Sequence, residues 1–134
     1  MARLLADVMS SNLLVVAPED TLGEAAEKMS ARGLGAALVL DAGRLRGILT
    51  ERDLLNAVAS RVDANEARVH EWMTERPVTA PQTMPIGRAA SIMVARGFRH
   101  LPIVEGERAI GIVSLPDIVR ATARVYPEYE DDED

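Results

Sequence analysis

The sequence predicts a mixed α/β (α+β) protein made of two copies of one β-α-β-β-α unit, packed against each other with approximate two-fold symmetry. The first observation is an internal repeat, because Gly, Met and Asp positions recur at one spacing, as Gly23 and Gly87 do 64 residues apart. The second is that each copy alternates short apolar runs, typical of buried strands, with segments of helical periodicity. The third is size, because a copy of roughly 60 residues buries too little surface to be stable alone.

In the first copy, the clearest element is a helix between Thr21 and Gly33. Thr21 and Glu24 have the spacing of a capping box, and glycine commonly follows the end of a helix. Pro18 ends the apolar run before this helix, as expected for a short strand. The other expected elements are strands over residues 13–17, 36–40 and 45–50 and a second helix over residues 51–60.

The second copy repeats this order after a linker over residues 61–68. Its first helix is expected over residues 84–96 with Pro85 in the first turn, where a missing N–H removes no hydrogen bond. The other expected elements are strands over residues 78–80, 101–104 and 109–114 and a helix over residues 115–125. We place the first repeat at residues 1–62, the second at 63–126, and a disordered acidic tail at 127–134.

Composition excludes several classes of function. The chain of 134 residues has no cysteine, so disulfides and cysteine zinc sites are excluded. No apolar stretch approaches the ~20 residues that span a bilayer, and no signal peptide is evident, so a cytoplasmic location is expected. The net charge of −6 matches the acidic tail, and the body lacks the basic stripe of a nucleic-acid binder. We recognise no catalytic or metal motif and expect neither enzyme activity nor a required cofactor.

One short motif occurs in each copy: Gly, two apolar residues, Thr or Ser, two variable residues and Asp. The hydroxyl residues are Thr50 and Ser114, and the aspartates are Asp53 and Asp117. In one interpretation they form capping boxes and nothing more. In the other, the helix N-terminus, the hydroxyl and the carboxylate bind phosphate and ribose oxygens of a ligand. The two interpretations are compatible, because a ligand can use a capped helix end.

With both motifs in register, the chain resembles a tandem pair of CBS domains, also called a Bateman module, from about residue 8 to about residue 124. Residues 8–10, 72–74 and 99–104 also resemble the family pattern. The resemblance implies a stand-alone regulatory module that binds an adenosine-containing ligand (AMP, ADP or ATP, or else S-adenosylmethionine or NAD) between the repeats. It also implies a homodimer that acts on an unidentified partner protein. The alternative is an interaction module without any small-molecule ligand.

The resemblance implies two clefts. Arg99 and His100 are either a surface arginine and a hydrogen-bonded histidine, or a phosphate-binding pair beside Ser114. Their counterparts Gly35 and Ala36 carry no charge, so we expect unequal clefts, with the better one at Ser114. That cleft is implied to contain Ser114, Asp117, Arg99, His100, Ile112, Ser10, Asn12, Leu14, Leu34 and Gly35. The weaker cleft is implied to contain Thr50, Asp53, Ile48, Thr74, Pro77, Val78, Phe98 and Arg99.

Overall fold

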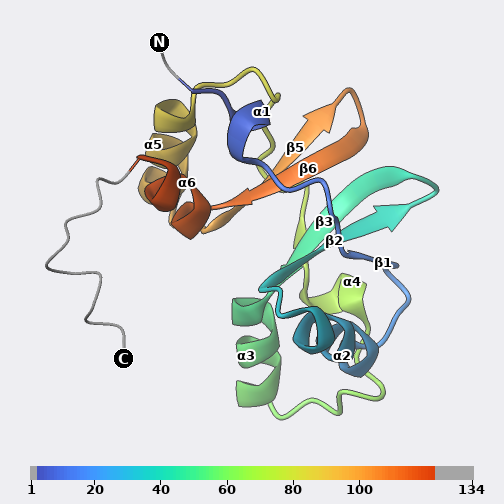
Figure 1. The fold of residues 1–134 in the computed structure, drawn as a ribbon. Coiled ribbons are helices and arrows are strands. Elements are labelled where there is room, and N and C mark those ends of the chain that lie inside the picture. Colours follow the sequence, from blue (N-terminus) through green and yellow to red (C-terminus); the bar gives the residue numbers. More distant parts are fainter. Residues whose placement is uncertain (1–2, 123–134) are drawn as a thin grey trace, which may run out of the picture.

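The strands of both repeats lie in the middle of the molecule, and the helices lie outside them (Figure 1). The computed structural model describes residues 3–122, so the predicted acidic tail falls outside the described part of the chain. Helices α2 (Leu22–Arg32) and α3 (Glu51–Ala59) lie at one end of the molecule, and α5 (Ile86–Arg96) and α6 (Leu115–Thr122) lie at the opposite end (Figure 1). The predicted fold of two related α/β units is confirmed.

The first repeat forms most of a four-stranded sheet. Strand β1 runs parallel to β2, β2 runs antiparallel to β3, and β3 pairs with the short strand β4 of the second repeat. The first-repeat elements are β1 (Val15–Val16), α2 (Leu22–Arg32), β2 (Ala36–Asp41), β3 (Arg44–Thr50) and α3 (Glu51–Ala59). Because β4 joins β3, the sheet crosses the boundary between the repeats.

The second repeat contributes a two-stranded antiparallel sheet of β5 and β6. Its elements are α4 (Val69–Trp72), β4 (Thr74–Glu75), α5 (Ile86–Arg96), β5 (His100–Glu105), β6 (Arg108–Ser114) and α6 (Leu115–Thr122). The strand expected at residues 78–80 is wrong, because only Ala80 makes a bridge, to Ile103. Pro77, directly before this segment, has no N–H to donate to a ladder.

The helix ends follow the local sequence closely. Thr21 caps α2, with its N–H donating to Glu24 Oε1 at 2.9 Å and its Oγ1 accepting from the Glu24 N–H at 3.1 Å. Gly33 ends α2 in the left-handed conformation at φ 62°, as the sequence predicts. Pro85 was expected inside the first turn of α5 but is its N-cap residue, with an extended ψ of 141°.

Two short helices each pack on the repeat that does not directly follow them in the sequence. Helix α1 (Leu5–Val8), which the sequence analysis did not predict, comes first in the chain but packs on the second repeat. Its Leu5 is fully buried there, and the Leu5 N–H donates to the Met84 carbonyl at 2.9 Å. Helix α4 does the reverse, since Val69 is fully buried in the core of the first repeat. Each core is therefore completed by the segment that precedes the other repeat.

A third apolar cluster joins the two sheets. Ala36, Leu38 and Ile48 are buried there, with Ala109 and Ile112 of the second repeat packed against them. Strands β3 and β6 thus face each other across the boundary between the repeats. Strand β3 leads into α3 and β6 leads into α6, the two helices that begin at the Thr50 and Ser114 motifs. None of the helices between residues 3 and 122 is long and apolar enough to cross a bilayer.

Candidate functional site

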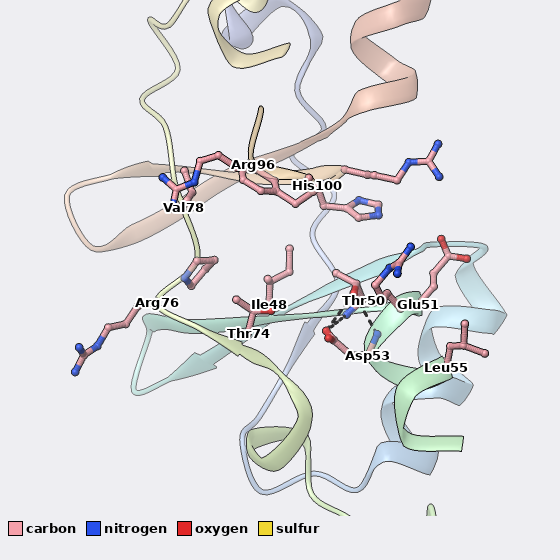
Figure 2. A pocket seen from close by; sticks show the side chains of 15 residues that line it. Ile48, Thr50, Glu51, Asp53, Leu55, Thr74, Arg76, Val78, Arg96 and His100 are labelled. Carbon is pink, nitrogen blue, oxygen red and sulfur yellow. Dashed lines mark hydrogen bonds between the residues drawn. The ribbon is translucent and has the colours of Figure 1, made fainter. Parts of the chain in front are cut away.

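A cavity of about 580 Å³ opens between the two repeats (Figure 2). The first repeat supplies the end of β3 and the start of α3, and the second supplies β4, the chain after it, the end of α5 and the start of β5. Residues of both repeats therefore line the cavity, as expected for a cleft between two packed copies of one unit. The volume lies in the range of small-molecule sites, roughly 300–1,000 Å³.

The Thr50–Asp53 capping box lies at the wall of this cavity. The Thr50 N–H donates to Asp53 Oδ2 at 2.8 Å, Thr50 Oγ1 donates to the same oxygen at 3.1 Å, and the Asp53 N–H donates to Thr50 Oγ1 at 3.4 Å. Asp53 Oδ1 accepts no hydrogen bond from the residues that the structure describes. Burial raises the pKa of the Asp53 carboxyl, while its hydrogen bonds with Thr50 oppose the shift. A half-buried carboxylate oxygen is therefore available to a hydroxyl donor.

Cationic side chains gather around the same cavity. The lining arginines are Arg52, Arg76, Arg96 and Arg99. Within residues 3–122 none of their guanidinium groups forms an ion pair or donates a hydrogen bond. Figure 2 shows Arg96 along one wall of the cavity, whereas the side chain of Arg76 points away from it. These unpaired groups suit an anion, because guanidinium matches phosphate and carboxylate oxygens geometrically.

His100 lies in the cavity wall at the start of β5. Burial lowers the pKa of its imidazole. The Glu51 carboxylate works in the opposite direction and the Arg99 guanidinium in the same one, with Asp117 also raising the pKa. The His100 side chain extends toward the start of α3 (Figure 2), so it is placed to meet a ligand bound beside Thr50.

The apolar part of the cavity is an aliphatic slot with one aromatic side chain. Ile48 is buried and pairs with Thr74 across β3 and β4. Pro77, Val78 and Phe98 are half-buried and come from the second repeat. A flat base can lie between such surfaces, which gives the cavity an apolar side opposite its charged side.

Where the second cleft was expected, the same motif has both carboxylate oxygens of its aspartate already engaged. The Asp117 N–H donates to Ser114 Oγ at 3.2 Å, and the Ser114 N–H donates to Asp117 Oδ2 at 3.4 Å. Arg120 donates to the other carboxylate oxygen, Oδ1, at 2.7 Å. Burial favours a higher pKa for Asp117, but the hydrogen bonds from Ser114 and Arg120 outweigh it and lower the pKa.

Two residues implied for the second cleft, Gly35 and Asn12, contact other side chains of the protein. A Cβ built on Gly35 would lie 2.5 Å from Glu51 Oε1, so the Glu51 side chain covers this glycine. Arg32 donates to Asn12 Oδ1 at 2.7 Å and to the Asn12 carbonyl at 3.3 Å. Gly35 was expected to admit a ligand, whereas here it admits a carboxylate of the protein itself.

The structure brings together all residues implied for the cleft that we had ranked second. They are Thr50, Asp53, Ile48, Thr74, Pro77, Val78, Phe98 and Arg99, and His100 joins them. The predicted ranking of the two clefts by affinity stays a prediction. His100 pairs with Ser114 through the backbone, but Arg99 and His100 both line the Thr50 cavity.

The residues implied for the other cleft are more dispersed. Ser10 forms an antiparallel bridge with Ile112, and Asn12 is bound by Arg32. Leu14 is 8% exposed and belongs to the core of the first repeat, so a ligand cannot reach it without unpacking that core. Leu34 lies in a shallow groove between α2 and α3.

Six cavity residues were missed from the sequence, namely Glu51, Arg52, Leu55, Arg76, Arg96 and Gly97. Alignment of the two copies carried a usable signal, because Asn12 and Arg76 occupy equivalent positions 64 residues apart. Among the described residues, no three His, Asp or Glu side chains gather as they would around a metal ion.

Comparison with known proteins identifies the family. The CBS domain matches residues 5–60 and 69–124. The chain therefore belongs to the CBS domain family and contains a tandem pair of these domains. It is 34% identical over 128 residues to a 17.7 kDa protein from the bps2 3'region of Acidianus ambivalens, covering 94% of this chain and 77% of that one.

Solved structures show the same architecture. The CBS-domain containing protein ATU1752 from Agrobacterium tumefaciens superposes with a TM-score of 0.83 at 34% identity, covering 88% of this chain and 98% of that chain. The CBS domain pair of protein MJ0100, solved in complex with 5-methylthioadenosine and S-adenosyl-L-methionine, gives a TM-score of 0.82 at 27% identity. That match covers 90% of this chain and 96% of the neighbour.

Proposed function

We propose that this chain is a regulatory ligand-sensing module that binds one adenosine-containing molecule in the cavity between Thr50–Asp53 and Arg96–His100. The observation that carries the proposal is the free Asp53 Oδ1 at the wall of a cavity of about 580 Å³ whose arginines have no partner in the described chain. The adenosine-containing ligands of the related MJ0100 pair support it.

The geometry supports a simple division of work within the site. Asp53 Oδ1 accepts a ribose hydroxyl, since it is half-buried and next to the N-terminus of α3. The base lies in the slot that includes Ile48 and Val78. Anionic groups of the ligand lie toward the N–H groups of α3, where the helix dipole favours negative charge. The ligand is exchangeable and is not a resident cofactor.

Regulation by the ligand follows from the fact that both repeats contribute residues to the cavity wall. A ligand held by Asp53 of the first repeat and by Phe98 or His100 of the second bridges the two repeats. It therefore stabilises the relative orientation in which both sets of contacts form, by the difference in its affinity for the available arrangements. Because the proposed task is binding without turnover, purified protein should leave ATP intact in a chromatographic assay.

A second copy of the chain is the first partner that we propose. Leu55 is 66% exposed, Val58 is 73% exposed and Val119 is 53% exposed, and all three lie on the helices that follow the motifs. Leu55 and Val119 are equivalent positions, so both repeats present an apolar residue on the same helical face. Sedimentation should show a dimer that Val119→Asp dissociates. A wild-type monomer would contradict this part of the proposal.

Isothermal titration with AMP, ATP, S-adenosylmethionine and 5-methylthioadenosine tests the function. We expect one molecule per chain for at least one ligand. Asp53→Asn should weaken it at least tenfold, because a hydrogen bond to a charged group is worth about 1.5–3 kcal/mol. The matched variant Asp117→Asn should change affinity less than about twofold, because Arg120 already holds Asp117. Absence of binding by all four ligands would favour the interaction module without a ligand.

A further inference from the structure

Two positions have the same place in both repeats, and one of them holds the same residue whereas the other does not. Arg32 ends α2 and Arg96 ends α5, and the two are 64 residues apart. Asn12 and Arg76 are related by the same spacing and follow the segments that bridge to the motif strands. The pairs Asn12–Arg32 and Arg76–Arg96 therefore occupy equivalent corners of the two clefts.

In the first pair, the arginine is satisfied by the protein. Arg32 donates to Asn12 Oδ1 at 2.7 Å and to the carbonyls of Asn12 and Leu13 at 3.3 Å each. The amide oxygen of Asn12 is thus a built-in acceptor for Arg32. Arg32 therefore has hydrogen-bond acceptors within the protein and needs no anion from a ligand.

In the second pair, the built-in acceptor is replaced by a second cation. The Arg76 side chain has no hydrogen-bond acceptor, so Arg96 lacks the side-chain amide oxygen that Arg32 has in Asn12. Neither guanidinium forms an ion pair with another described residue, and both line the cavity. Arg76 also adopts a left-handed backbone at φ 48°, which is costly for a residue with a side chain and is often found at functional sites.

The other charges of the cavity strengthen the imbalance. Arg52 and Arg99 add two positive charges, whereas Glu51 and Asp53 are the lining carboxylates. With Asp53 used for ribose, the remaining cations exceed the remaining carboxylates. Such a site repels a sulfonium cation and attracts several negative charges held close together.

Resting on the proposed function, we propose that this cavity selects an adenosine ligand carrying a chain of two or three phosphates, and that Arg96 is its main specificity-determining residue. Arg96 lies along the cavity wall, whereas Arg76 must rotate inward from the outward position seen in Figure 2. Side-chain rotations of this kind commonly accompany binding. The proposal separates this chain from the MJ0100 pair, whose ligands carry no phosphate chain.

The test compares ATP, ADP, AMP, adenosine and S-adenosylmethionine on wild-type protein by isothermal titration. We expect affinity to fall in the order ATP, ADP, AMP, adenosine, with ATP at least about tenfold tighter than S-adenosylmethionine. Arg96→Met should weaken ATP about tenfold and leave adenosine within about twofold, because only the phosphates lose a donor. Arg32→Met is the matched control and should leave ATP within about twofold. Arg76→Met is a second variant, with a smaller loss expected.

Each of the other outcomes refutes a different part of the proposal. S-adenosylmethionine binding as tightly as ATP in an Asp53-dependent manner, or equal ATP loss in Arg96→Met and Arg32→Met, would overturn phosphate selection and leave the proposed function standing. Equal binding of ATP, GTP and inorganic tripolyphosphate, all weakened by Arg96→Met, would overturn adenosine recognition and leave phosphate selection standing. Absence of binding by every probe, tripolyphosphate included, would overturn both.

Discussion

The two clefts of this molecule share one motif and differ in what surrounds it. At Thr50–Asp53 the carboxylate keeps a free oxygen and the nearby arginines lack partners in the described chain, whereas at Ser114–Asp117 the protein satisfies its own groups. The two repeats thus share one fold and one motif, and they differ in the side chains that surround the motif aspartate. A shared motif identifies where a ligand can bind, but its neighbours decide whether one does.

The difference is visible in single counterpart positions. Arg120, which neutralises Asp117, corresponds to Asn56 in the first repeat, so Asp53 has no such partner. Glu51, which covers Gly35 at the second cleft, corresponds to Leu115. Exchanging members of such pairs is therefore the direct way to test the comparison.

The largest expected effect concerns the motif glycines. A Cβ on Gly47 would lie 2.7 Å from the Thr74 carbonyl oxygen, whereas on Gly111 the nearest backbone oxygen, of Ser10, is at 3.2 Å. Gly47→Ala should therefore lower the free energy of unfolding by about 2–3 kcal/mol and Gly111→Ala by about 1 kcal/mol, within the usual cost of overpacking. Urea denaturation measures both. Equal losses would show that the two strand junctions are equally tolerant.

The next effect concerns the arginines at the helix ends. Arg32→Met removes three hydrogen bonds and should lower the free energy of unfolding by about 0.5–1.5 kcal/mol. Arg96→Met removes none within the described chain and should stay within about 0.5 kcal/mol of wild type. Thermal and urea denaturation without ligand would measure the difference. A larger loss in Arg96→Met would mean that Arg96 is structural, contrary to its proposed role.

A smaller effect is a pair of opposite pH dependences. The raised pKa of Asp53 stabilises the folded state below pH 3.8, and this contribution is lost as pH rises through the folded-state pKa. The lowered pKa of Asp117 stabilises it above pH 3.8, and this contribution is lost as pH falls through the folded-state pKa. The stability differences between wild type and Asp53→Asn or Asp117→Asn should therefore slope in opposite directions in acid. Slopes of the same sign would contradict the assignment.

The smallest effect concerns His100, whose counterpart is Ala36. Because its folded-state pKa lies below 6.5, the folded protein loses stability as pH falls from above 6.5 toward that pKa. His100→Gln should remove this loss, and His70→Gln, at an exposed site, should retain it. A bound phosphate chain favours protonated His100, so ATP affinity of wild type should rise over the same decrease in pH. An identical pH profile in both variants would remove His100 from the site.

The fold was predictable because the repeat, the capping boxes and the buried strands are local signals. Thr21, Gly33 and Thr50 lie where their side chains or backbone preferences place them. Strand β4 was not predictable in this way, because two residues gain strand geometry only by pairing with β3 across the repeat boundary. Helix α1 was missed for a similar reason, since its apolar side is buried only by the distant second repeat.

Most residues that line the cavity were predictable from the sequence, but which charged side chains are paired by the protein and which are not was not predictable. That the two clefts are unequal stays a prediction, whereas the structure places the side chains of Arg99 and His100 in the wall of the Thr50 cavity. His100 pairs with Ser114 through the backbone, but the side chains of Arg99 and His100 line the Thr50 cavity. Because Arg99 is the counterpart of Gly35, which was assigned to the Ser114 cleft, the two-fold relation places Arg99 in the Thr50 cleft. The Arg120 ion pair and the position of Glu51 over Gly35 depend on side-chain conformation, which spacing does not encode.

The exchange of α1 and α4 between the repeats sets an order for folding during synthesis. Leu5 leaves the ribosome well before Met93 and Leu101, which belong to the same buried cluster. At about 5–20 residues per second, the apolar side of α1 waits for several seconds without its partner. The first repeat waits less, because Val69 follows it directly along the chain. The nascent chain therefore completes the core of the first repeat, with helix α3, before it buries the apolar side of α1.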